Sequence, residues 1–125
     1  MSTMGAGRQQ KGREAEELAA GFLEKQGLDV VARNVRCLLG EIDLVAWHGK
    51  TVVFVEVKSR FTRGYGTPQE MVSESKKKRL TRLAQWYLKK HGLLRQPARF
   101  DVVAIQFHEG EPVVTWIANA FPAAE

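Results

Sequence analysis

Three charged side chains stand inside the apolar runs of one segment, GEIDLVAWHGKTVVFVEVKSR, which extends from Gly40 to Arg60. They are Asp43, Glu56 and Lys58. A buried charge is destabilising unless a partner charge or a metal ion compensates it. The segment alternates as two β-strands joined by a tight turn at His48-Gly49-Lys50, so the charges are predicted to lie on a hairpin.

Composition narrows the class of protein. The 125 residues are 44% hydrophobic and 26% charged, as in one globular domain. No apolar run is long enough to span a membrane, and the polar, basic N-terminus lacks the apolar region of a signal peptide, so we expect a cytoplasmic protein. A single cysteine, Cys37, excludes an intramolecular disulfide. The net charge of +5 suits a polyanionic partner.

The order of predicted elements is that of an α/β protein. The patterns indicate a helix over 11–26, strands within 28–39, at 41–47 and at 51–60, a second helix ending near 91, and strands at 99–107 and 113–117. Either Thr67 or Ser73 caps the second helix. We predict a single domain over 10–120 with a four- or five-stranded mixed sheet. Residues 1–9 are predicted to be a disordered basic tail, and 121–125 a C-terminal tail.

The first helix carries acids beside its apolar stripe. The stripe is formed by Ala15, Leu18, Ala19, Phe22 and Leu23. At about 100° per residue, Glu16 and Glu14 lie on its two margins and Glu17 points to solvent. Either marginal acid can reach a site on the sheet, and a solvated helix edge is the alternative.

The hairpin charges suit a metal site. Neighbouring strands lie about 5 Å apart, so Asp43 and Glu56 converge if they project from the same face. Two carboxylates so close repel each other unless a cation lies between them. Oxygens of Asp43, Glu56 and the Val57 carbonyl are predicted ligands for Mg²⁺ or Mn²⁺, and Lys58 would stabilise charge in phosphodiester hydrolysis. The alternative is a cross-strand ion pair.

The second helix is strongly basic. Its predicted buried stripe consists of Val72, Leu80, Leu83, Ala84 and Tyr87. Lys76 lies in the middle of this stripe and is predicted to point at the hairpin site. The other predicted nucleic-acid contacts are Lys77, Lys78, Arg79, Arg82 and, at the end of the hairpin, Arg60. The alternative is a solvated basic face from which Lys76 extends to water. Asp101 is expected to be a turn residue, with a supporting carboxylate as the alternative.

These motifs resemble a known family. An Asp followed by Glu-x-Lys on adjacent strands, after a helix that carries a Glu, is similar to the PD-(D/E)xK nuclease superfamily. Over about residues 12–105, the sequence also resembles the YraN-type family of endonuclease-like proteins related to archaeal Holliday junction resolvases. The motifs that carry this resemblance are AEELAAGFL, GEIDLVA, FVEVKSR, GTPQEMVSESK and RFDVVAI. The resemblance implies an αβββαβ restriction-endonuclease-like core. It places the active site at Glu16, Asp43, Glu56 and Lys58, with Lys76 beside it, and so selects Glu16 over Glu14.

The sequence analysis therefore predicts a Mg²⁺- or Mn²⁺-dependent DNA endonuclease, with branched DNA as a candidate substrate. A resolvase that cuts two symmetric strands would act as a homodimer, for which the sequence holds no sign. The alternative is a protein that keeps the nuclease fold and binds nucleic acid without cutting it, through the basic helix.

Overall fold

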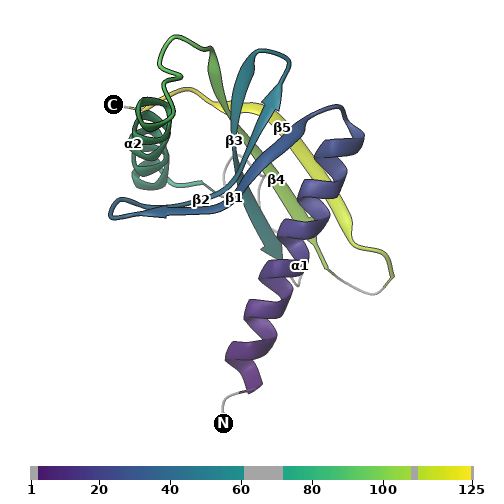
Figure 1. The fold of residues 1–125 in the computed structure, drawn as a ribbon. Helices are drawn as coiled ribbons and strands as arrows, with labels where there is room; N and C mark the ends of the chain where they lie inside the picture. The colour runs from purple at the N-terminus through teal and green to yellow at the C-terminus, as the bar shows by residue number, and fades with distance from the viewer. Residues whose placement is uncertain (1–2, 61–71, 108–109, 125) are drawn as a thin grey trace.

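A five-stranded mixed sheet forms the centre of the computed structural model, which describes residues 3–60, 72–107 and 110–124 (Figure 1). Two helices and five strands make up these residues: α1 (Thr3–Lys25), β1 (Asp29–Cys37), β2 (Gly40–His48), β3 (Thr51–Arg60), α2 (Glu74–Lys90), β4 (Ala98–Gln106) and β5 (Val113–Phe121). The predicted single α/β domain is confirmed. In the described part of the chain, neither helix is long and apolar enough to cross a membrane.

The strands follow the order of the chain across the sheet, β1-β2-β3-β4-β5. Only the β3–β4 pair is parallel, and the other three pairs are antiparallel. Parallel neighbours need a crossover connection, and α2 lies in the connection between β3 and β4. The apolar run of β3 is explained by its central place in the sheet, where both faces are covered.

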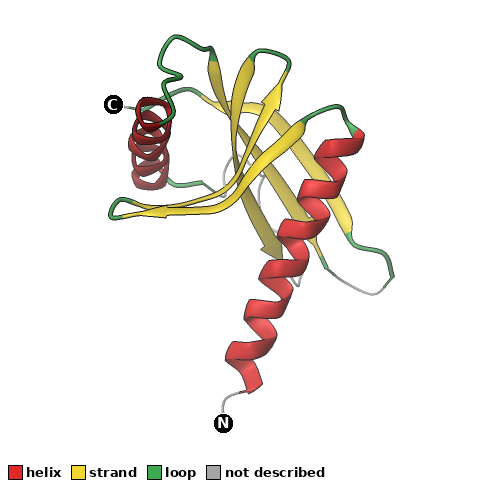
Figure 2. Cartoon of the chain, viewed as in Figure 1, coloured by secondary structure: helices red, strands yellow, loops and turns green. Residues whose placement is uncertain are grey.

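The two helices cover opposite faces of the sheet (Figure 2). On one face, α2 buries Leu80, Leu83, Ala84 and Tyr87 against strand residues such as Phe54 and Val102. All four helix positions, and Val72 before the helix, match the predicted stripe. On the other face, α1 packs against a second cluster that includes Leu44, Val53, Val55, Val103 and Ile105.

Helix α1 differs from its prediction in two ways. Leu18 is 37% exposed, whereas Ala20 is buried with Ala15, Ala19 and Leu23. The contact face is therefore rotated toward small residues, whose short side chains let the helix approach the sheet closely. The helix also begins at Thr3 and not near residue 11. Its first turns contain glycines and no apolar stripe, so the sequence pattern did not indicate a helix there.

Strand β2 changes partners along its length. It pairs with β3 only from Leu44, opposite Val55, to His48, whereas it pairs with β1 from Gly40 to Trp47. We call the two-stranded ribbon of residues 35–42 the hairpin arm; Figure 1 shows it extending beneath α2. Ile42 packs with the α2 cluster, although regular β alternation would place it on the same face as Leu44. The stronger twist of a two-stranded ribbon explains this difference.

Two further element boundaries depend on local chemistry. Ser73 is the N-cap of α2, since its side chain accepts a hydrogen bond from the Lys76 amide at 3.2 Å; the alternative cap, Thr67, lies outside the described residues. Strand β5 continues past the predicted end at Ile117 to Phe121. It does so through an irregularity at Asn119, whose φ of 52° a sequence pattern does not reveal.

Candidate metal centre

Asp43 and Glu56 meet at the point where β2 separates from β3. The β2–β3 ladder ends at the Leu44–Val55 pair, one position before these acids would face each other. There the side chain of Asp43 replaces the missing backbone partner, because its Oδ2 accepts a hydrogen bond of 2.8 Å from the Val57 amide. The sequence predicted that these acids converge, and the structure brings them together at the opening of the sheet.

Glu56 is the most enclosed member of the cluster. Its side chain is 3% exposed, and two lysines face the same oxygen, Oε2. Lys76 Nζ lies 2.9 Å from Oε2 and Lys58 Nζ lies 3.7 Å from it. Lys76 belongs to the first turn of α2, so the positive end of the helix dipole lies at the same side of the carboxylate.

The surroundings of Asp43 change the pKa of its carboxyl group. The pKa of Asp43 is raised from 3.8 to about 8, mainly by burial and then by the hydrogen bond and charge of Glu56, against the lowering effect of the Val57 amide. The charge of Glu16 also raises the pKa. Asp43 therefore favours its protonated form beside the Glu56 side chain, as a carboxyl group does when another acid lies close to it.

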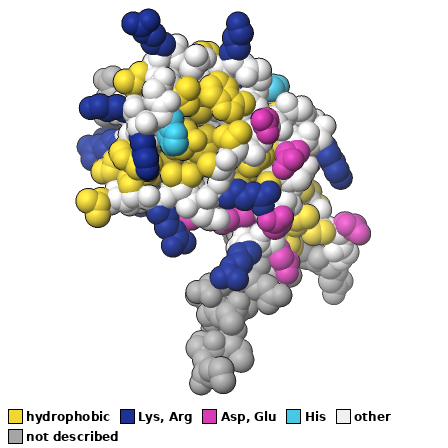
Figure 3. Space-filling view, viewed as in Figure 1, with side chains coloured by type: hydrophobic (Ala, Val, Ile, Leu, Met, Phe, Trp, Pro, Cys, Tyr) yellow, Lys and Arg dark blue, Asp and Glu magenta, His cyan; other side chains and the backbone are white. Residues whose placement is uncertain are grey.

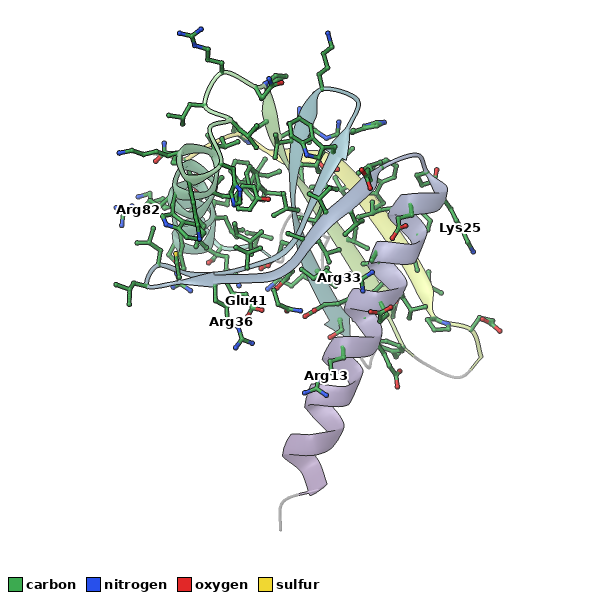
Figure 4. The ribbon with its side chains drawn as sticks, in the orientation of Figure 1. Arg13, Lys25, Arg33, Arg36, Glu41 and Arg82 are labelled. Carbon is green, nitrogen blue, oxygen red and sulfur yellow. The ribbon has the colours of Figure 1, made fainter. Side chains whose placement is uncertain are left out.

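The first helix supplies the third acid of the site. Of the two candidates left open by periodicity, Glu16 is the one whose charge acts on Asp43. Glu16 lines a hollow of about 310 Å³ between α1 and the hairpin arm, together with Gly12, Arg13, Asn34, Arg36 and Glu41. Figure 4 shows Arg13 on α1 facing the same side as Arg36 and Glu41 on the arm.

Sequence patterns did not single out this hollow. Its arm residues come together because Arg36 and Glu41 are paired across β1 and β2, with a contact of 3.6 Å between Nε and Oε1. Asn34 has a positive φ of 52°, which breaks the regular alternation of β1. The sequence offers one signal for it, since regular alternation along β2 places Glu41 on the same face as Asp43.

The donor set suits a hard cation. Asp43 and Glu56 offer carboxylate oxygens, and the carbonyl of Val57 leaves its strand on the same side as the amide that binds Asp43. Among the residues that the structure describes, no group of three or more His, Cys, Asp or Glu is close enough to hold a metal. Any such cation would therefore be held by two acids and backbone or solvent oxygens, the pattern typical of Mg²⁺.

The basic residues of α2 have different surroundings. Lys76 is paired with Glu56, whereas Lys77 contacts Glu74 at 3.0 Å and lies over the Phe121 ring at 5.7 Å. Three exposed cations complete the predicted set: Lys78, Arg79 and Arg82. Arg60 ends β3, but its side chain lies outside the described residues.

Asp101 is a correction to the sequence analysis. It lies inside β4, not in a turn, and is fully buried. Its carboxylate accepts hydrogen bonds from Arg99 Nε at 2.9 Å, Trp116 Nε1 at 3.0 Å and the Asn119 amide at 2.9 Å. These partners fully pair the carboxylate and tie β4 to β5, so its role is structural.

Comparison with known proteins gives the chain a family. The model of "Uncharacterised protein family UPF0102" matches residues 15–105. A UPF0102 protein of Desulfosudis oleivorans is 46% identical over 116 residues, 93% of each chain, and one of Moorella thermoacetica is 45% identical, covering 91% of this chain and 97% of that one. A solved structure, Pyrococcus furiosus SfsA in complex with Ca²⁺, is similar with a TM-score of 0.47 and 15% identity over 86% of this chain and 63% of that one. On the family model and these relatives, the chain belongs to the UPF0102 family.

Proposed function

We propose that this protein is a Mg²⁺- or Mn²⁺-dependent DNA endonuclease whose centre is the Asp43–Glu56 pair. The observation that carries the proposal is the convergence of two acids at the opening of the sheet, where Asp43 binds the Val57 amide and two lysines face Glu56. A protein gains nothing in stability by holding two acids together. The arrangement is advantageous when a divalent cation replaces the proton.

The residues divide into ligands and charge stabilisers. Asp43, Glu56 and the Val57 carbonyl would hold the cation, which when bound would polarise a phosphodiester oxygen and lower the pKa of a water ligand. Lys58 would stabilise the negative charge that develops on the phosphate. Lys76 holds Glu56 in place from α2 at 2.9 Å, and Glu16 would add an outer acid from α1.

The surface around the centre supports a polyanionic substrate. Exposed Lys78, Arg79 and Arg82 lie on the same helix as Lys76, so a phosphate backbone held by them would be near the acids. Figure 3 shows Lys and Arg side chains spread over the visible face of the molecule, some of them on the side of α2. A cut in DNA requires both this contact surface and the metal centre.

Calorimetric titration with Mn²⁺ tests the metal centre without requiring activity. Wild type is expected to bind Mn²⁺, and at a hundredfold excess over Kd the ion would raise the free energy of unfolding by about 2.7 kcal/mol. Asp43→Ala and Glu56→Ala are expected to lose both effects. Asp29→Asn, an exposed acid at the far end of β1, is the matched control and should behave as wild type. Equal metal uptake in all four proteins would refute the proposed centre.

Plasmid cleavage tests the chemistry. Lys58→Met should retain Mn²⁺ binding and lose about a hundredfold or more of the cleavage rate, because it removes only charge stabilisation. Lys89→Met, an exposed lysine at the other end of α2, should leave the rate unchanged. An intact plasmid with wild type in both Mg²⁺ and Mn²⁺ would refute the nuclease.

One observation favours a second candidate, a nucleic-acid-binding protein that does not cut. Lys76 and Lys58 already neutralise Glu56 in the absence of any metal. In such a protein the lysines would hold the sheet opening closed, and the exposed cations of α2 would bind nucleic acid by counterion release. Salt-sensitive DNA binding without metal uptake would favour this candidate over the nuclease.

A further inference from the structure

Two leucines form the exposed end of the hairpin arm. Leu38 and Leu39 connect β1 to β2 between the paired residues Cys37 and Gly40. Leu38 is fully exposed and Leu39 is 43% exposed. Figure 3 shows hydrophobic atoms at this protruding end of the molecule. Two adjacent exposed leucines at a projecting tip gain nothing for the folded core.

The turn chemistry makes the leucines unexpected. Two-residue hairpin turns favour Asn, Asp and Gly, which accept positive φ. In the described chain neither leucine has a positive φ, and Gly40 after them takes the unusual value of 138°. Gly40 therefore accommodates the backbone geometry while the tip stays apolar. Departures from local folding preference of this kind are expected at functional sites.

The arm is supported from one side, so the tip is held in position. A side chain at Gly40 would meet Arg79 Cδ at 3.3 Å and Leu83 Cδ1 at 3.6 Å, which shows how closely the arm lies against α2. Val35 and Cys37 pack against the same core as α2. The arm is thus a projection held against α2, with Leu38 and Leu39 exposed at its end.

The surroundings of the tip are cationic. Arg36 lies beside it on β1 with its side chain 75% exposed, and Arg79 and Arg82 are exposed on α2 above it. Figure 4 shows Arg82 on the α2 side of the arm and Arg36 on the opposite side. Cations on both sides of an apolar tip suit a partner with phosphates on its outside and flat apolar surfaces between them. Like charges disfavour a second copy of this chain, whose net charge is also +5.

We infer that Leu38 and Leu39 form a wedge that enters the base stack of DNA where stacking is interrupted, as at a branch point. Apolar side chains inserted between bases must offset the cost of unstacking, and this cost is smaller at a branch point, where stacking is already interrupted, than within a linear duplex. The arginines would bind the phosphates on both sides of the opening. This inference rests on the proposed DNA binding and names branched DNA as the preferred substrate.

Binding measured in EDTA separates this inference from cleavage. A labelled four-way junction and a linear duplex with the same arm sequences are titrated with wild type and with the Leu38→Ser/Leu39→Ser variant. Wild type is expected to prefer the junction by about tenfold or more, the value of burying an apolar side chain. The variant should bind both DNAs to within about twofold, while the salt dependence of its duplex binding is unchanged.

Leu94→Ser is the matched control, because Leu94 is also exposed, at 61%, but lies after α2. It should keep the preference for the junction. The wedge is refuted if wild type shows no preference, if the double variant keeps it, or if the double variant weakens binding to both DNAs equally. A dimer of wild type that dissociates in the double variant would assign the tip to self-association and also refute the wedge. A wild-type protein that prefers junctions but cuts nothing would refute the nuclease and leave the wedge standing.

Discussion

Two groups of buried acids lie in one sheet and are compensated in opposite ways. Asp101 in β4 is surrounded by donors, with Arg99, Trp116 and the Asn119 amide around its two oxygens. Asp43 and Glu56 instead face each other, and the pKa of Asp43 rises to about 8. Donors around a buried carboxylate stabilise its charge, whereas a second acid beside it disfavours that charge. The two sites therefore predict opposite responses to removing the acid.

Asp101→Ala is expected to have the largest effect. The change leaves the Arg99 guanidinium, the Trp116 indole and the Asn119 amide without their acceptor, so the free energy of unfolding should fall by about 3–5 kcal/mol. Urea unfolding measures the loss. Asp43→Asn is the comparison, since it keeps an oxygen for the Val57 amide and puts a neutral amide in place of a carboxyl group whose protonated form is favoured up to about pH 8. It should be as stable as wild type or more stable in EDTA, and equal losses in both variants would refute the contrast between the two sites.

The sequence was sufficient to predict that Asp43 and Glu56 lie close together. It was insufficient to predict that Asp101 is buried and paired. The hairpin residues lie close in sequence, so period-2 alternation alone brings both acids to one place. Helical periodicity likewise aimed Lys76 at the same place, where it contacts Glu56 at 2.9 Å. The partners of Asp101 depend on the register of β5 and on the irregularity at Asn119, which are set by the folded sheet.

Two other differences between the sequence pattern and the structure also have their origin in tertiary packing. Leu18 was assigned to the α1 stripe on spacing, but the helix turns its alanines toward the sheet. Regular alternation along β2 would place Ile42 on the face of Leu44, but the ribbon twists where the ladder with β3 ends. Local patterns therefore predicted elements and the acid pair, whereas rotation and twist required the packed structure.

The pH dependence of stability should distinguish the two groups of acids next. The unfolded chain releases the Asp43 proton near pH 3.8, whereas the folded protein holds it to about pH 8. Between these values the folded state binds the extra proton, so in EDTA stability falls as pH rises, by at most about 1.4 kcal/mol per pH unit. Urea unfolding at several pH values measures this slope. Asp43→Asn should flatten the profile, and Asp29→Asn should not; parallel profiles for wild type and Asp43→Asn would contradict the raised pKa.

The smallest expected effect on stability comes from a change of backbone conformation and not from a change of charge. Gly40→Ala places a methyl group at a φ of 138° and 3.3 Å from Arg79 Cδ, so it should lower the free energy of unfolding by about 1–2 kcal/mol. Gly21→Ala, in α1 with open space around it, should instead raise stability by about 0.5–1 kcal/mol. Thermal unfolding measures both. Because the Gly40 change strains the arm without touching the acids, the slope with pH should remain that of wild type. A flattened slope would show that the proton affinity of Asp43 depends on how the arm lies against α2.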